Sequence, residues 1–142
     1  MATVREAEPG RLITEAAREL GKLKEMAPPA WAIVVKTGSG RMRPPEQDDW
    51  WFIRSASMLR KLYFTNTLGV SRFRSLYSNR KNRGHKPEHT YPASGAVTRN
   101  ILKQMGATGL VKVEKGKGRS LTAKGRQFLD GVAKTLQSSP SV

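Results

Sequence analysis

The stretch GLVKVEKGKGRSLT, residues 109–122, decides the fold more than any other part of this sequence. Apolar and polar side chains alternate over residues 110–114 and 119–122, which predicts two short β-strands. The Lys-Gly-Lys-Gly tip at residues 115–118 is typical of a β-hairpin turn. Three predicted helices precede this hairpin, and that order is typical of a winged helix, in which the third helix enters a groove and the hairpin touches the nucleic-acid backbone.

The three helices are predicted from apolar spacing. The first, residues 49–64, carries apolar side chains around most of its circumference, which places it at the centre of the fold. The second covers residues 71–77 with Ser71 as its N-cap, and the third covers residues 94–105. We therefore expect a mainly α protein with a winged-helix core.

Further helices are expected on either side of this core. Residues 11–26 carry one apolar stripe, and residues 123–136 form a last helix after Thr122. Between the first helix and the core, residues 31–35 predict a short buried segment, and the Gly- and Pro-rich residues 36–47 predict a loop. The predicted organisation is a single domain over 1–142, with an N-terminal helical extension (10–48), the winged-helix core plus C-terminal helix (49–136) and a flexible tail (137–142).

Residues 78–93, SNRKNRGHKPEHTYPA, contain one Gly, two Pro and no apolar run. This composition predicts a long loop, and long loops in compact domains are usually functional or disordered. The loop is also rich in Arg and Lys, so we expect it to be ordered when a polyanionic partner is bound.

The net charge points to a polyanionic partner. The 142 residues include 26 Lys and Arg against 11 Asp and Glu, a net charge of +15. Residues 1–48 hold eight basic and seven acidic side chains, whereas residues 49–142 hold eighteen and four. Nucleic acid is the favoured partner, since phosphate neutralisation would supply most of the affinity. An anionic membrane surface is the competing partner, but the densest basic stretch lacks the bulky apolar face of a membrane-binding helix.

Several classes of protein are excluded by composition. Cysteine is absent, which excludes disulfides and thiolate chemistry, and the chain has only two histidines. No apolar run is long enough to span a membrane, and the N-terminus lacks the apolar stretch of a signal peptide, so we expect an intracellular protein. The four carboxylates of residues 49–142 show no spacing for acid–base catalysis, so we predict no enzyme, no cofactor and no small-molecule substrate.

Four segments together resemble one family: DWWFIRSASMLRKLY (49–63), GVSRFRSLYSNRKNRG (69–84), SGAVTRNIL (94–102) and GKGRSLTAKGRQFLD (116–130). In their order and spacing they are similar to the archaeal and eukaryotic small-subunit ribosomal protein nineteen, the type without a bacterial counterpart. PPAWAIVVKTG (28–38) also resembles that family's Pro-x-Trp…Val-Lys-Thr-Gly segment. The resemblance implies a winged-helix core, a cytoplasmic place in the head of the small ribosomal subunit on rRNA, and a role in subunit assembly and pre-rRNA maturation.

Several residues match the family's functional positions. Arg54 and Arg60 match its basic central helix, Arg99 matches the basic residue of its third helix, and Gly118–Arg119 match its wing. Two positions depart from the family. Tyr77-Ser78-Asn79 stands where Tyr-Gly-Gly is usual; Asn tolerates a left-handed turn, but its side chain argues against close approach of the backbone to RNA. Asn100 replaces a position that is often basic, which leaves less charge beside Arg99.

The candidate RNA-binding residues are cations of the central helix, the second helix, the loop, the third helix and the wing. They are Arg54, Arg60, Lys61, Arg72, Arg74, Arg80, Lys81, Arg83, Lys86, Arg99, Lys103, Lys117 and Arg119. The alternatives are a structural ion pair of a central-helix cation with Asp48 or Asp49, and idle solvated lysines elsewhere.

Other features favour structural interpretations. Trp50, Trp51, Tyr63 and Phe64 have helical spacing, so core packing is preferred to base stacking. A metal site at His85 and His89 is disfavoured because Gly84 and Pro87 oppose a helix. TGSG at 37–40 lacks the residues of a nucleotide-binding loop.

The sequence thus predicts a structural rRNA-binding protein of the small subunit. It would bind phosphates on several rRNA segments, lie beside neighbouring ribosomal proteins and act as a monomer within the subunit. The alternative is a winged-helix DNA-binding transcription regulator, for which the hairpin and third helix would serve equally well. Such regulators usually dimerise through an added apolar helix and concentrate their cations on the third helix and wing.

Overall fold

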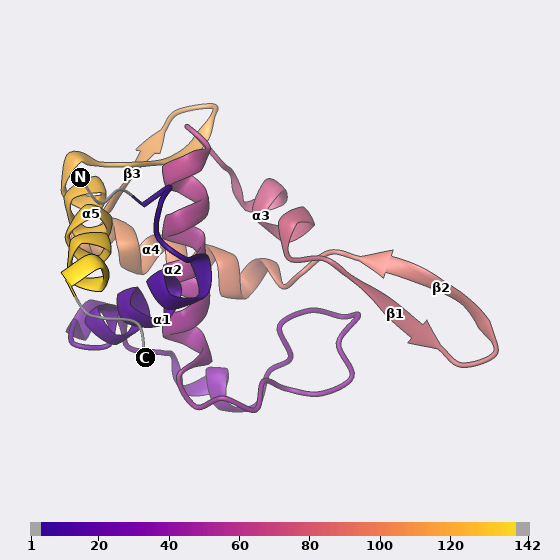
Figure 1. Cartoon of the computed structure of the whole chain (residues 1–142). Helices are drawn as coiled ribbons and strands as arrows, with labels where there is room; N and C mark the ends of the chain where they lie inside the picture. Colours follow the sequence, from indigo (N-terminus) through magenta and orange to yellow (C-terminus); the bar gives the residue numbers. More distant parts are fainter. Residues whose placement is uncertain (1–3, 139–142) are drawn as a thin grey trace.

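A computed structural model describes residues 4–138 of the chain. Five α-helices and two separate two-stranded antiparallel sheets make up the fold (Figure 1). In chain order the elements are α1 (Pro9–Leu20), two 3₁₀ turns (Lys24–Met26 and Ala30–Ile33), α2 (Trp50–Phe64), α3 (Val70–Leu76), β1 (Asn79–Arg83), β2 (Lys86–Tyr91), α4 (Gly95–Thr108), β3 (Val111–Glu114), β4 (Gly118–Leu121) and α5 (Ala123–Ser138).

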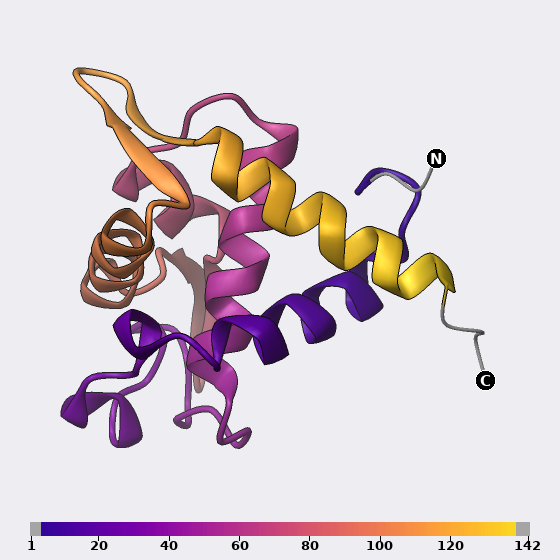
Figure 2. The same cartoon turned by 90° about the vertical axis from the view of Figure 1, so that its left-hand side faces the viewer.

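Helix α2 lies at the centre of the molecule, as its wide apolar arc predicts. Trp51, Ala56, Met58, Leu59 and Leu62 are at most 1% exposed. Helices α1 and α5 pack against it on one side, as the turned view shows (Figure 2). The apolar stripe of α1 is therefore buried against α2 and α5 within the domain.

The predicted winged-helix order is confirmed. Helices α2, α3 and α4 are followed by the β3–β4 hairpin, in which Val111 pairs with Leu121 and Glu114 with Gly118. Helix α4 begins close to the start of the predicted helix 94–105, and Ser94 is its N-cap, because Ser94 Oγ accepts a hydrogen bond from Val97 N. The wing is also joined to the segment before α3: Leu68 N donates to Arg119 O at 3.0 Å and Arg119 N donates to Leu68 O at 2.8 Å.

Gly118 has a structural role in the wing. Its φ is +114°, a conformation that L side chains rarely adopt, and a Cβ there would lie 2.7 Å from the backbone of Leu68 and Gly69. The glycine therefore allows the wing to reach the helical body.

The prediction of a loop over residues 78–93 is wrong, because β1 and β2 form a second hairpin that extends away from the body (Figure 1). Nearly all its side chains are exposed, so the strands lack the apolar alternation by which strands are predicted. Gly84, with φ +73°, makes the turn, and its N–H donates to Asn82 Oδ1 at 2.9 Å. Pro87 is tolerated because a two-stranded sheet has only edge strands.

Four smaller expectations are also corrected. The predicted helix 11–26 ends at Leu20 and is followed by a 3₁₀ turn, and the second core helix begins at Val70 with Gly69, not Ser71, as its N-cap. The segment 31–35 is not buried as a run: Ile33 and Val34 are 84% and 73% exposed, because a 3₁₀ turn directs only Ala32 and part of Trp31 inward. In the predicted tail 137–142, residues 137 and 138 belong to α5 and residues 139–142 lie outside the described part.

Candidate nucleic-acid interface

Three polar side chains of α2, Arg54, Ser57 and Lys61, meet the ring of Tyr77 at the end of α3. Their spacing of three and four places them on one stripe of the helix. The Arg54 guanidinium carbon lies 4.0 Å from the centroid of the Tyr77 ring and Lys61 Nζ lies 5.3 Å from it. Ser57 Oγ and Tyr77 Oη are 2.6 Å apart. An aromatic ring thus orients both cations without neutralising them.

The environment of Arg54 is positive and partly desolvated. Burial lowers the pKa of the Arg54 guanidinium, Tyr77 opposes this shift, and the nearby charge of Arg41 adds to it. Burial also raises the pKa of the Tyr77 hydroxyl, which therefore stays neutral. Arginine remains protonated under such perturbation, so Arg54 is a charged group without a compensating charge.

Arg60 belongs to a different surface of α2. Its guanidinium lies 4.6 Å from the centroid of the Phe64 ring, over which Arg5 also lies, at 5.2 Å. Among residues 4–138, no ion pair joins Asp48 or Asp49 to any of the three α2 cations, which are Arg54, Arg60 and Lys61. The alternative of a structural pair at these positions is therefore not what the structure shows.

A second group of cations gathers where α4 begins. A Cβ at Gly95 would lie 3.3 Å from Arg99 Nη1 and 3.4 Å from Arg74 Cδ, so the two arginines meet beside this glycine. Arg74 Nε donates to Ala93 O at 2.8 Å, which fixes its position. Lys103 follows Arg99 one turn later and Arg72 lies on α3, and both are exposed.

The β1–β2 hairpin displays the third group. Lys81 lies over the Tyr91 ring at 5.5 Å and Lys86 is exposed near the tip. Arg83 Nη1 donates to His89 Nε2 at 2.8 Å. Arg80 is the exception, because its Nε lies 3.4 Å from a carboxylate oxygen of Glu88. Three of the four hairpin cations thus lack a carboxylate partner among the residues described.

The wing carries a fourth, weaker group. Lys117 is exposed at the tip, and Arg119 is half-buried beside Leu68. Glu114 lies 3.4 Å from Lys112 Nζ and accepts a hydrogen bond from Ser120 at 3.1 Å. These two bonds lower the pKa of the Glu114 carboxyl, which therefore stays ionised and offsets part of the wing's charge.

Comparison with known proteins agrees with this geometry. Residues 3–139 match the family described as ribosomal protein S19e. The chain belongs to the S19e family of ribosomal proteins. It is 45% identical over 127 residues to the small ribosomal subunit protein eS19 of Aeropyrum pernix, covering 88% of this chain and 83% of the relative. It is 36% identical over 131 residues to the eS19 protein of Oryza sativa subsp. japonica, covering 92% and 90%. S19e proteins are structural components of the ribosome, not enzymes.

The departures of this S19e chain from the family pattern have structural explanations. Asn79 does not adopt a left-handed conformation; it begins β1, and its Nδ2 donates to Gly40 O at 3.0 Å. Asn100 Nδ2 donates to Ala96 O at 2.7 Å within α4. Both side-chain amides therefore bond to the backbone of this chain, and neither supplies a positive charge at its position.

Sequence reasoning missed two cations of the S19e chain, Arg41 and Arg43. They lie in the loop 36–47, which reaches towards the hairpin (Figure 1). With Arg54 and Tyr77 they line one cavity. The near-neutral charge of residues 1–48 as a whole concealed them, although the alternation Arg-Met-Arg in a Gly- and Pro-rich loop was a visible signal.

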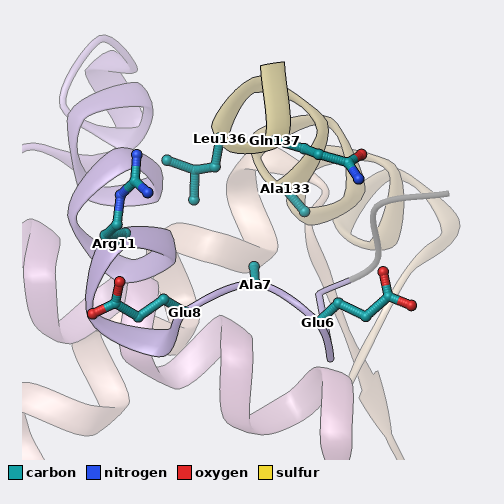
Figure 3. A pocket seen from close by; sticks show the side chains of 7 residues that line it. All are labelled: Glu6, Ala7, Glu8, Arg11, Ala133, Leu136 and Gln137. Carbon is teal, nitrogen blue, oxygen red and sulfur yellow. The ribbon is translucent and has the colours of Figure 1, made fainter. Parts of the chain in front are cut away.

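On the α1 and α5 side of the S19e fold, acidic and basic side chains are mixed, since Glu6, Glu8 and Arg11 line the same cavity. Figure 3 shows a smaller cavity there, of about 170 Å³, between the segment before α1 and the end of α5. Ala7, Ala133 and Leu136 surround its space, and Glu6 and Glu8 lie at its two sides. With two carboxylates and one guanidinium, that of Arg11, the lining has no net positive charge and does not favour a phosphate.

The aromatic side chains of α2 have mainly structural roles. Trp51 is 1% exposed and packs edge-to-face on Trp50 and Trp31, as the prediction of core packing requires. Tyr63 is half-buried and donates to Asp130 at 3.0 Å. Phe64 differs, because it is 38% exposed and is covered by cations.

Within residues 4–138, no three His, Cys, Asp or Glu side chains are grouped to hold a metal ion. No helix in that range has the length and apolar character needed to cross a membrane. The TGSG segment serves the fold, since Thr37 O accepts a hydrogen bond from Ser94 N at 2.7 Å and Gly38 forms a β-bridge with Ala93.

Proposed function

We propose that this S19e protein binds rRNA in the head of the small subunit of the cytoplasmic ribosome. It also supports assembly of this subunit and maturation of its pre-rRNA. The observation that carries the proposal is the set of oriented cations on the α2 stripe, the β1–β2 hairpin and the start of α4, which, apart from Arg80, have no carboxylate partner among residues 4–138. The names of the relatives, small ribosomal subunit proteins, support the same assignment. Neighbouring ribosomal proteins are its other expected partners.

Binding is mainly electrostatic and based on shape. The hairpin extends beyond the body while the wing lies on another side of it, so the cations can reach several RNA segments at once (Figure 1). Phosphate contacts fix the register of a protein on RNA, and duplex RNA hides its base edges in a narrow major groove. We therefore assign the thirteen candidate cations to phosphate contact, with Arg80 the weakest because Glu88 already pairs with it.

The alternative, a DNA-binding winged-helix regulator, fits the structure less well. Such regulators dimerise through an added apolar helix, whereas Leu12, Ala16 and Leu20 of α1 are fully buried inside this domain. The hairpin, which the regulator fold does not require, carries as many cations as the wing. Both features favour a monomer within a ribonucleoprotein.

Sedimentation and crosslinking test the proposal together. The full chain is expected to co-migrate with small ribosomal subunits at moderate salt, and photo-crosslinkers placed at positions 60, 83 and 119 are expected to react with separate rRNA segments. A free dimer that shifts duplex DNA and leaves rRNA uncrosslinked would overturn the proposal in favour of the regulator.

A further inference from the structure

A cavity of about 430 Å³ lies between the loop 36–47 and helix α2. Its volume falls within the roughly 300–1,000 Å³ that small-ligand pockets occupy. Three arginines line it, Arg41 and Arg43 from the loop and Arg54 from α2, together with the aromatic side chains Trp50 and Tyr77. No lysine is among its lining residues.

The loop that carries two of these arginines is fixed to the base of the hairpin. Asn79 Nδ2 donates to Gly40 O at 3.0 Å, directly before Arg41. Arg41 N in turn donates to Gly38 O at 3.2 Å, and Gly38 forms a bridge with Ala93. These bonds place Arg41 opposite α2 before any ligand arrives.

The pocket holds positive charge without an internal counter-charge. No ion pair joins Arg41, Arg43 or Arg54 to a carboxylate within residues 4–138. Glu46 and the aspartates that follow it in the chain do not line the cavity. Arg54 Nη1 is buried and lacks a hydrogen-bond partner among the described residues. A buried polar atom of this kind costs free energy unless a ligand satisfies it.

The chemistry of the lining selects a phosphate group. The planar guanidinium donates pairs of parallel hydrogen bonds to phosphate oxygens, which makes arginine the preferred residue for bidentate phosphate recognition. Free phosphate and a phosphodiester of RNA share this chemistry. The aromatic rings of Trp50 and Tyr77 favour RNA, because bases adjoining the bound phosphate can stack on aromatic and guanidinium planes.

We propose that this pocket binds one backbone phosphate of an rRNA strand through Arg41, Arg43 and Arg54, with the strand passing between the loop 36–47 and α2. The inference deepens the proposed rRNA-binding function and rests on it. It adds two arginines from the nearly neutral N-terminal part to the binding surface, and it makes the loop a part of the interface.

Binding of the full chain to a small-subunit rRNA fragment, measured between 50 and 200 mM salt, tests the pocket. The variants are Arg41→Gln, the double variant Arg41→Gln/Arg43→Gln, and Arg18→Gln as a control with the same charge change on α1, where Arg18 pairs with Glu15. Losing a phosphate contact makes the salt dependence less steep by about one unit of slope. Over this salt range the factor by which affinity falls should thus be about three times smaller for Arg41→Gln than for the wild type. The Arg18→Gln control should match the wild type.

The source of the phosphate is tested by NMR of the arginine Nε–Hε groups. Hexauridylate is expected to shift the Arg41 and Arg54 resonances at concentrations where inorganic phosphate does not. Equal shifts with both probes would overturn the assignment to an RNA strand. Wild-type rRNA binding with an unchanged salt slope in the double variant would overturn the pocket while leaving the proposed function intact, whereas a wild type that does not bind rRNA would overturn both.

Discussion

Neutralising the β1–β2 hairpin should weaken the salt dependence of RNA binding without weakening the fold. In the triple variant Lys81→Gln/Arg83→Gln/Lys86→Gln, the cations that lack a carboxylate partner are removed and the Arg80–Glu88 pair is kept. If each cation contacts one phosphate, the slope of log K against log salt becomes less steep by about 2.1 to 2.7. Between 50 and 200 mM salt the affinity of both proteins falls, and the factor by which it falls should be about 20 to 40 times smaller for the variant than for the wild type.

The melting temperature should hardly change in the same variant. Lys81 and Lys86 are exposed and Arg83 is half-buried, all three lie outside the core, and each such surface substitution usually changes stability by less than about 0.5 kcal/mol. If the three effects add, the melting temperature of a domain of this size should therefore move by no more than about 5 °C. Filter binding over a salt series and thermal unfolding by circular dichroism are the two assays.

A matched control distinguishes hairpin contacts from total charge. The triple variant Arg18→Gln/Lys22→Gln/Lys24→Gln removes the same charge from α1 and the turn after it, near Glu15 and Glu19. Its slope should equal that of the wild type. An unchanged slope in the hairpin variant, or an equally reduced slope in both variants, would show that the hairpin cations do not make specific phosphate contacts.

Three further predictions concern stability and titration. Gly118→Ala should destabilise the fold by about 2 kcal/mol or more in urea unfolding, since both its φ of +114° and its backbone contact oppose a Cβ, whereas Gly116→Ala, with open space around it, should cost only about 1 kcal/mol. Trp51→Phe should lower the free energy of unfolding by about 2 kcal/mol, because the 2.8 Å hydrogen bond from Trp51 Nε1 to Gln104 Oε1 of α4 is lost and the smaller ring fills less of the core. An unchanged urea midpoint would contradict this structural role of Trp51. Because the pKa of Glu114 is lower in the folded protein, its carboxylate stabilises the fold above the pKa that Glu114 has in the unfolded chain, and this stabilisation is lost as the pH falls through the pKa in the folded protein. In Ser120→Ala the titration midpoint of the Glu114 carboxyl, measured by carbon NMR, should rise.

The parts of the fold that the sequence predicted are those in which burial follows a regular period. Helix α2 and the wing show spacings of three to four and of two, so their positions follow from which face is apolar. The β1–β2 hairpin was missed because it is held by its own backbone bonds between strands whose side chains are polar and mostly exposed. Such contacts leave no apolar period in the sequence.

The candidate site was predictable in part for a related reason. Clustered cations such as Arg80 and Lys81 can be counted from the sequence, but their partners depend on pairing across the hairpin, which assigns Glu88 to Arg80 and Tyr91 to Lys81. The approach of Arg41 to Arg54 depends on the bond from Asn79 to Gly40, between segments 39 residues apart. Contacts over that separation are set by the tertiary fold and not by local spacing.

The reciprocal bonds between Leu68 and Arg119 have a consequence for assembly. They attach the wing to the connection between α2 and α3, so the wing cannot swing independently of the central helix. Under the proposed function, two RNA segments that contact these elements would be held at a separation that the protein has set before it binds. Little ordering entropy is then lost on association, and the protein can act as a fixed spacer between rRNA segments that have not yet found their final arrangement.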